Sequence, residues 1–325
     1  MSRLVYFNGK YVDEEDAKIS IYDSSLMFGD MIFEMTRSFN KKQFKLREHL
    51  ERLKYGIKIL RIPIDFEIKN IEKICSEVIE RNEPFFKKDD EHRLMIEVSR
   101  GLLDIYKSET KIHKEPNLII ADFPLRWTVV GMGKLFDSGI NAVITSQRAI
   151  PAQYLDPKIK NRNRIFYLMA NIEASLFKGE NNWPLLLDSN GNISEGSGDN
   201  FFIIKNNTII SPIGKDILRG ISRDYVMNEL SKQLKINSIE KNIDPYDVYN
   251  ADEAFMTGTP FCMLPVTKLN GVEIGSGKVG KIFKKILRKW SLNCKVDIRK
   301  QILNWNSKSK NSSYKRKGIT PYSFS

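Results

Sequence analysis

The segment NISEGSGDNFF, residues 192–202, contains a glutamate, then residues typical of a tight turn, and then the start of an apolar run. Glu195 follows a short apolar stretch, and the glycines after it permit backbone angles that other residues avoid. Phe201 and Phe202 then begin a run with the composition of a buried strand. The segment therefore predicts two strands joined by a tight turn, with Glu195 at the end of the first. A hairpin with a solvent-facing glutamate would explain the same pattern without any ligand.

Two further segments offer small-residue turns with hydrogen-bond donors. Residues 217–224, ILRGISRD, predict a helix start with Ser222 as the N-cap residue. Free N–H groups at such a start bind phosphate well, although a capped helix needs no ligand. Residues 256–260, MTGTP, predict a turn that carries two hydroxyl groups.

A basic segment, KIKNRNR at residues 158–164, stands directly before a firmly apolar helical pattern. It contains two lysines, Lys158 and Lys160, and either could carry chemistry. A solvated basic loop is the alternative interpretation of the same residues.

Apolar spacing predicts the other elements. We expect a hairpin at 4–12, strands at 93–98, 117–121, 141–145, 184–187, 201–204, 208–210 and 253–256, and helices at 47–60, 68–81, 163–178 and 222–234. This mixture predicts an α+β fold. The predicted domains are a small N-terminal α+β domain at 1–123, a connector at 124–136, a larger C-terminal domain at 137–300 and a basic, disordered tail at 301–325.

Composition is that of an ordinary globular protein of about two domains, at roughly 100–200 residues each. The chain has 325 residues, 41% hydrophobic and 28% charged. Three cysteines and three histidines suit neither a disulfide framework nor a multi-histidine site, so we expect no metal. The N-terminus lacks the apolar region of a signal peptide, and no run of about 18 apolar residues occurs. We therefore expect a cytoplasmic protein without a membrane segment.

The net charge of +12 is of a kind found in nucleic-acid-binding proteins. Five basic residues and no acidic residue lie in the tail, which leaves +7 on the rest of the chain. Lysine-rich surface helices such as 281–289 account for much of the remainder. We interpret the charge as a solvated surface and expect no nucleic-acid partner. A non-enzymatic basic binding protein is the remote alternative.

Taken in order, these segments resemble the class IV aminotransferases, which include branched-chain aminotransferases, D-amino acid aminotransferases and aminodeoxychorismate lyases. Two further segments agree: FGDMIFE at 28–34 is similar to the family's Y/F-G-D/T-x-x-F/Y-E, and LREHLERL at 46–53 is similar to its R-x-H-x-x-R-L helix start. The resemblance covers about residues 3–290. It implies a fold-type IV enzyme with two α/β domains, an active site between them, pyridoxal 5'-phosphate (PLP) as cofactor, and a homodimer or larger homo-oligomer.

The resemblance also implies roles for particular residues. Lys160, rather than Lys158, matches the family's lysine, because Asn163 and the pair Glu173-Ala174 follow it at the family's spacing. Lys160 would carry PLP as a Schiff base and shuttle a proton, and Glu195 would keep the pyridine nitrogen protonated. The other implied cofactor contacts are Leu218 on the ring and, at the phosphate, Arg47, Ile221, Ser222 and Thr259.

The substrate class is less clear from the resemblance. Arg93 matches the carboxylate arginine of branched-chain enzymes, whereas Arg100 matches that of D-amino acid enzymes and a similar motif in the lyases. Phe33 and Arg37 match the branched-chain pattern. Three positions depart from family patterns: Leu26 replaces a tyrosine of D-amino acid enzymes, Met35 a threonine of the lyases, and Arg164 a tyrosine near the ring.

We therefore predict a transaminase that moves an amino group between a branched-chain or similar L-amino acid and a 2-oxoacid such as 2-oxoglutarate. A D-amino acid aminotransferase and a 4-amino-4-deoxychorismate lyase are the alternatives within the fold. Arg93 and Arg100 are an odd number of residues apart in a predicted strand, which puts them on opposite faces. We predict that Arg93 faces the cofactor and that Arg100 is peripheral.

Overall fold

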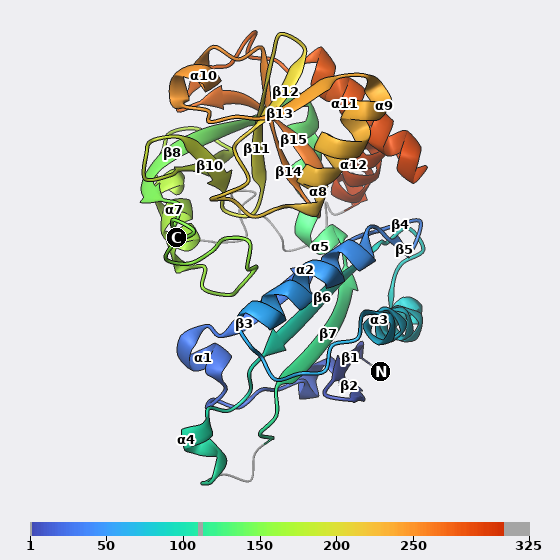
Figure 1. Ribbon diagram of the computed structural model, residues 1–325. Coiled ribbons are helices and arrows are strands. Elements are labelled where there is room, and N and C mark those ends of the chain that lie inside the picture. Colours follow the sequence, from blue (N-terminus) through green and yellow to red (C-terminus); the bar gives the residue numbers. More distant parts are fainter. Residues whose placement is uncertain (1, 110–112, 309–325) are drawn as a thin grey trace. The chain divides into compact units, whose positions relative to one another are not determined.

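The computed structural model describes residues 2–109 and 113–308, and the chain divides into two compact units (Figure 1). The first unit comprises Met1–Trp127 and Ile159–Arg164, and the second comprises Thr128–Lys158 and the chain from Ile165 onward. The short segment that contains Lys160 thus belongs to the first unit, although residues on both sides of it belong to the second.

The first unit contains a five-stranded antiparallel sheet in the order β2-β1-β7-β6-β3. The expected hairpin at 4–12 is confirmed, with positive φ at Asn8 and Gly9 in its turn. The strands expected at 93–98 and 117–121 are also confirmed, as β6 and β7 of this sheet. The strands are β1 (Leu4–Phe7), β2 (Lys10–Asp13), β3 (Met31–Met35), β6 (His92–Ser99) and β7 (Asn117–Pro124).

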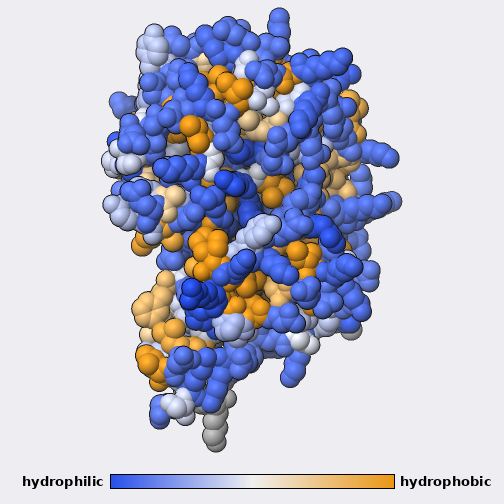
Figure 2. Space-filling model, viewed as in Figure 1, coloured by the Kyte–Doolittle hydropathy of each residue, from blue (hydrophilic) through white to orange (hydrophobic). Residues whose placement is uncertain are grey.

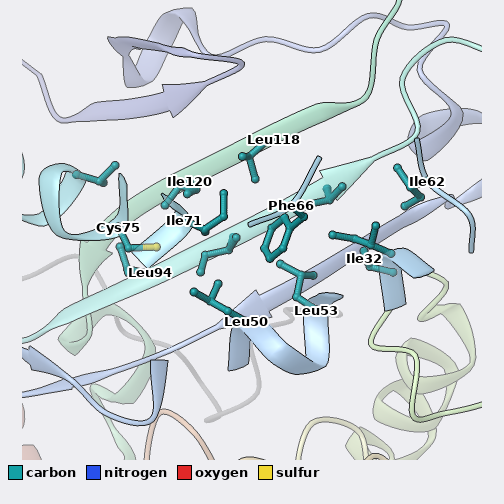
Figure 3. Packing of buried hydrophobic residues seen from close by; sticks show 14 of the residues in the cluster. Ile32, Leu50, Leu53, Ile62, Phe66, Ile71, Cys75, Leu94, Leu118 and Ile120 are labelled. Carbon is teal, nitrogen blue, oxygen red and sulfur yellow. The ribbon is translucent and has the colours of Figure 1, made fainter. Parts of the chain in front are cut away.

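Two helices, α2 (Leu46–Ile59) and α3 (Ile68–Asn82), pack on one face of this sheet, as predicted from their apolar spacing (Figure 1). Figure 3 shows the resulting core, in which side chains of both helices meet side chains of the strands. Its labelled members are Ile32, Leu50, Leu53, Ile62, Phe66, Ile71, Cys75, Leu94, Leu118 and Ile120. Because side chains alternate along a strand, Phe33, Arg93 and Glu97 project from the opposite face.

The second unit contains a nine-stranded mixed sheet. Eight of its strands follow the order β10-β9-β8-β15-β14-β11-β12-β13, and the ninth, β16 (Val272–Glu273), pairs with β15. The strands expected at 141–145, 184–187, 201–204, 208–210 and 253–256 are confirmed. They are β8 (Ile140–Arg148), β9 (Asn182–Leu187), β11 (Asn200–Lys205), β12 (Thr208–Ser211) and β14 (Glu253–Gly258). The two-strand turn predicted around Glu195 is present as β10 (Ile193–Gly196) and β11. The remaining strands, β13 (Asn237–Glu240) and β15 (Cys262–Leu269), were not predicted.

Two predicted helices differ in detail. The helix expected at 163–178 is α7 (Ile165–Ser175), which starts only where the chain leaves the first unit. The helix expected at 222–234 begins at Ile221, with Gly220 rather than Ser222 as the N-cap residue. It runs through α8 (Ile221–Asp224), a π-helical segment (Tyr225–Leu230) and α9 (Ser231–Leu234).

The predicted disordered tail at 301–325 requires a correction. Helix α12 (Ile298–Lys308) continues to residue 308, because Ile302 and Trp305 are buried and fix it on the second unit. Residues 309–325 lie outside the described part of the chain. In the preceding helix, α11 (Lys281–Cys294), the lysines Lys281, Lys284 and Lys285 are solvent-exposed. Figure 2 likewise shows hydrophilic residues over most of the face in view.

Within residues 2–109 and 113–308, the helices are too short or too polar to traverse a bilayer. In the same part of the chain, no group of three or more His, Cys, Asp or Glu side chains is arranged to hold a metal ion.

Candidate active site

The main chain around Lys160 is fixed along the edge strand β3 of the first unit. The Phe33 N–H donates to the Lys160 carbonyl at 3.0 Å, and the Arg162 N–H donates to the Met31 carbonyl at 2.9 Å. Between these two bonds, Ile32 and Asn161 form an antiparallel bridge. Ile159 packs with Ile32 in the core, so Lys160 and Arg162 project from the opposite face of the sheet. The segment is therefore an ordered part of the first unit, not a solvated loop.

A glycine permits this close approach. Gly29 has a φ of +69°, and a Cβ there would lie 2.3 Å from Asn163 Oδ1. Asn163 Nδ2 donates to the Gly29 carbonyl at 3.2 Å. The glycine of the Phe28-Gly29 motif thus has a physical role, because a side chain there would displace the chain just after Lys160.

Phe33 is surrounded by cations from this segment. Lys160 Nζ lies 4.8 Å from the centre of the Phe33 ring. The guanidinium carbons of Arg162 and Arg164 lie 3.7 Å and 5.9 Å from the same ring centre. Phe33 therefore provides an apolar surface against which Lys160 is placed.

A buried charge cluster lies on the helix-covered side of β3. Glu34 accepts hydrogen bonds from His49 at 2.7 Å and from Arg52 at 2.6 and 2.7 Å. Burial opposes ionisation of Glu34, but Arg52 and His49 outweigh it and lower the pKa of Glu34 to about 2. Burial, assisted by the positive charges of Arg52 and Lys160, lowers the pKa of His49 despite Glu34. The cluster thus lies close enough to Lys160 for their charges to interact.

The structure does not favour Arg47 as the phosphate ligand. Its side chain is 54% exposed and forms an ion pair with Glu72 of α3, with contacts of 3.1 and 2.8 Å. Arg52 of the same helix belongs to the buried cluster near Lys160 and was missed by the sequence analysis. The sequence does contain an indication that Arg52 lies on the same side of the helix as His49, because the two residues are three positions apart.

Arg93 is a buried arginine on the Phe33 face of the sheet, with an exposure of 7%. Its Nη2 donates to Met35 Sδ at 3.4 Å, while Nε and Nη1 have no hydrogen-bond partner among residues 2–109 and 113–308. Burial, together with repulsion from Arg37 and Arg162, lowers the pKa of Arg93 to about 10. A buried guanidinium with vacant donors suits an anionic ligand.

The other two predicted substrate residues have protein partners. Arg37 is buried, donates from Nε to the Ser38 carbonyl at 3.2 Å, and stacks on Phe39 with its guanidinium carbon 3.8 Å from the ring centre. Arg100, just past the end of β6, pairs with Asp30 at 2.5 Å and donates to the Leu60 carbonyl at 2.7 Å. Arg100 therefore has a structural role that Arg93 lacks.

In the second unit, Glu195 is buried rather than solvent-facing, with 5% exposure. Its Oε1 accepts from the Tyr167 hydroxyl at 2.8 Å. Its Oε2 accepts from Asn200 Nδ2 and from the Leu218 N–H, both at 3.0 Å. Donors therefore face both oxygens of this carboxylate and fix the side chain in place. Tyr167 and Asn200 were not predicted as site residues.

The remaining predicted contacts also belong to this unit. Ser222 is buried in the first turn of α8, and Ile221 is the first residue of that turn. Thr259 is partly buried just after β14. Thr257, which was not predicted, is buried, and its Oγ1 has no hydrogen-bond partner in the described part of the chain. These residues offer a set of hydroxyl and amide donors that suits an oxyanion such as a phosphate.

Comparisons with known proteins identify the family. The family model for class IV amino-transferases matches residues 31–269. The putative branched-chain-amino-acid aminotransferase of Methanocaldococcus jannaschii is 35% identical over 287 residues, 88% of this chain and 94% of the relative. The branched-chain-amino-acid aminotransferase of Escherichia coli K12 is 30% identical over 294 residues, 87% and 90% of the two chains.

Solved structures give the same result. The Escherichia coli branched-chain amino acid aminotransferase superposes with a TM-score of 0.80 at 28% identity, over 89% of this chain and 94% of that chain. A second branched-chain amino acid aminotransferase, solved in complex with N-(5'-phosphopyridoxyl)-L-glutamate, has a TM-score of 0.77 at 27% identity, over 94% and 98%. The chain has the α+β fold of the fold-type IV enzymes. It belongs to the class IV aminotransferases, a family of transaminases that use PLP.

Proposed function

We propose that this chain transfers amino groups between branched-chain L-amino acids and 2-oxoglutarate, with PLP held by the residues described above. The observation that carries the proposal is the buried Glu195 carboxylate with its three donors. A carboxylate held in a fixed position is the group needed beside a protonated ring nitrogen.

The residues present fit PLP. When bound, PLP supplies an electron-accepting ring that stabilises negative charge at the substrate Cα. Lys160 Nζ would hold the cofactor covalently until the amino group of the substrate displaces it, and the freed lysine amine would then move the proton at that Cα. Glu195 would hold the proton on the ring nitrogen, and Leu218 would pack on the ring. We assign the phosphate to Ile221, Ser222 and Thr259, with the vacant hydroxyl of Thr257 as a further donor.

For the charged phosphate ligand we propose Arg52 in place of Arg47. The proximity of Arg52 to His49 and Lys160 supports this choice, as does the exposed pairing of Arg47 with Glu72. Arginine suits phosphate because its charge is permanent and it carries several N–H donors, and here Glu34 accepts from Nε and Nη2 and so fixes the guanidinium.

The proposal of branched-chain donors rests on the names of the relatives. The proposal of glutamate and 2-oxoglutarate rests on Arg93, whose vacant donors suit a carboxylate. Leu26 and Met35 weigh against the D-amino acid and lyase alternatives. The test is a panel of donors, L-leucine, L-valine, L-isoleucine and D-alanine, each with 2-oxoglutarate. We expect the L-donors to react and D-alanine to fail. Activity with D-alanine alone, or pyruvate release from 4-amino-4-deoxychorismate, would assign the chain to one of the alternatives.

The assignment of Lys160 has its own test. Lys160→Ala should abolish turnover and the near-ultraviolet to blue absorbance of the bound cofactor. Lys158→Ala should retain both, because Lys158 Nζ pairs with Asp156 at 2.8 Å and donates to the Lys215 carbonyl at 3.0 Å. Loss of the absorbance in Lys158→Ala, and not in Lys160→Ala, would reverse the assignment.

We also infer a homodimer and a cytoplasmic location, in keeping with the family resemblance. Light scattering of the purified protein and fractionation of cells would test these two points.

A further inference from the structure

Arg162 is an arginine that the function proposed above does not use. It stands two residues after Lys160 and projects from the same face of the sheet. Its guanidinium carbon lies 3.7 Å from the centre of the Phe33 ring, the same ring that Lys160 Nζ approaches to 4.8 Å. Arg162 and Lys160 therefore lie against the same ring, so a ligand bound at Lys160 would lie near the charge of Arg162.

Glu97 fixes the position of Arg162. Glu97 lies directly across from Phe33 in the β3–β6 pairing, so all three side chains occupy one patch of the sheet. Arg162 Nε donates to Glu97 Oε1 at 2.9 Å, and Nη2 donates to the same oxygen. Nη2 also contacts Met95 Sδ at 3.4 Å. These contacts hold the guanidinium over the Phe33 ring.

One buried cation of this patch, Arg93, has no acidic partner among the described residues. Arg162 and Lys160 project from the same patch, and the positive charges of Arg37 and Arg162 lie close enough to repel Arg93. Glu97 is paired with Arg162, whereas Arg93 finds no carboxylate among the described residues. Buried positive charge without a counter-ion is costly, and an anion that binds beside it removes that cost.

We propose that Arg162 is a specificity-determining residue, which acts with Arg93 to select substrates whose side chain ends in a carboxylate over substrates with an apolar side chain. The inference rests on the proposed transamination and deepens it. It names dicarboxylic amino acids and their oxoacids as the class with the higher kcat/KM, while branched-chain L-amino acids still react as donors. An apolar side chain would leave the Arg93 guanidinium buried without an anion, whereas a carboxylate would supply one beside Arg93 and Arg162.

Two variants of the holoenzyme test the role of Arg162. Arg162→Gln removes the charge but keeps a polar side chain of similar reach. Glu97→Gln keeps Arg162 and removes its counter-charge. A specificity role predicts opposite effects: selectivity for carboxylates should fall in the first variant and hold or rise in the second. A merely structural pair predicts that both variants lose activity on every substrate alike. Arg299→Gln is the matched control, because Arg299 pairs with Asp137 on the exposed surface of the second unit.

The first measurement is the half-reaction of holoenzyme with a single donor, followed by the change in cofactor absorbance. We expect L-glutamate to exceed L-leucine in kcat/KM in the wild type. Arg162→Gln should reduce the ratio of the two values about tenfold or more, since a hydrogen bond to a charged group of this kind is worth roughly that factor. A ratio within about twofold of the wild type, or a wild type that prefers L-leucine, would overturn the proposal.

The second measurement needs no turnover and so separates this proposal from the proposed function. Calorimetry would compare the binding of glutarate and of 4-methylvalerate, a dicarboxylate and an apolar monocarboxylate, to the holoenzyme. We expect glutarate to bind more tightly, with Arg162→Gln reversing that order. Tighter binding of 4-methylvalerate to the wild type would refute the charge argument even if the enzyme transaminates. An enzyme that is inactive on every donor, yet binds glutarate through Arg162, would refute the proposed function instead.

Discussion

The carboxylate of Glu195 is positioned by donors from three separate parts of the chain. Tyr167 comes from α7, Asn200 from the start of β11, and the Leu218 N–H from the loop before α8. Because three donors share the positioning of this carboxylate, the loss of one should loosen its contact with the ring nitrogen without removing the carboxylate. Substitutions of Glu195 and of its donors can therefore separate the effect of the carboxylate charge from the effect of its positioning.

Glu195→Gln should bind PLP but slow kcat by about 10²-fold, because a charge-assisted contact is worth on the order of 2–3 kcal/mol. Tyr167→Phe, which keeps the ring and removes the hydroxyl that donates at 2.8 Å, should show a smaller loss in the same direction. Tyr154→Phe is the control, since Tyr154 is 79% exposed. Stopped-flow absorbance would measure the rates. An unchanged kcat in Glu195→Gln would rule out the role of this carboxylate in the reaction.

At the scale of elements, helix α2 carries two arginines that the sequence motif alone does not distinguish. Arg47 lies on the exposed side with Glu72, and Arg52 lies in the cluster with Glu34 and His49. Arg52→Gln should weaken PLP affinity by about tenfold or more, the worth of one charge-assisted contact. Arg47→Gln should leave the affinity unchanged. Equilibrium dialysis of the apoenzyme with PLP measures both, and the reverse order would restore Arg47 as the phosphate ligand.

The turn before α8 depends on a glycine for a steric reason. A Cβ at Gly220 would lie 2.1 Å from Asn200 Oδ1, and Asn200 also donates to Glu195. Gly220→Ala should therefore displace Asn200 and slow turnover as well as weaken cofactor binding. Gly214→Ala is a suitable control, since the nearest atom to a Cβ there is 3.5 Å away. Equal activity of the two variants would show that this part of the site tolerates the shift.

Periodicity predicted the helices α2 and α3 and most strands because their apolar residues recur with the spacing of a buried face. It did not predict β15, whose Cys262 adopts a φ of +66° after a turn, or β13, which is mostly exposed. The sequence motifs led to the predictions of Lys160 and Glu195. They also led to Arg47, in place of which we propose Arg52, and they gave no indication of Tyr167. Which arginine or tyrosine of a helix is used depends on the side of the helix that faces the site, and a motif does not give that side.

At the scale of the whole molecule, the Glu34 cluster predicts acid sensitivity. The pKa of Glu34 is lowered to about 2, so its stabilising contribution is present above the ordinary value near 4.5 and is lost as the pH falls toward 2. The contribution is on the order of 3 kcal/mol. Glu34→Gln should be less stable at pH 7, because His49 and Arg52 lose their buried partner, and its stability should depend less on pH below 4.5.

Urea unfolding at a series of pH values, followed by circular dichroism, would measure this effect. Glu14→Gln provides the comparison, because Glu14 forms an exposed pair with Arg3. If the stability of Glu34→Gln and of the wild type fell in parallel between pH 4.5 and 2, another group would have to account for the acid sensitivity.

The course of the chain has a consequence for synthesis. The first unit takes its last segment, Ile159–Arg164, from beyond residues 128–158 of the second unit. A nascent chain that has reached only Trp127 therefore lacks Ile159 in its core and the two backbone hydrogen bonds at β3. On the ribosome this unit cannot reach its final form until residue 164 has emerged from the exit tunnel. For the same reason, a gene fragment that stops at Trp127 encodes an incomplete fold, and neither unit can be excised as one continuous piece of DNA.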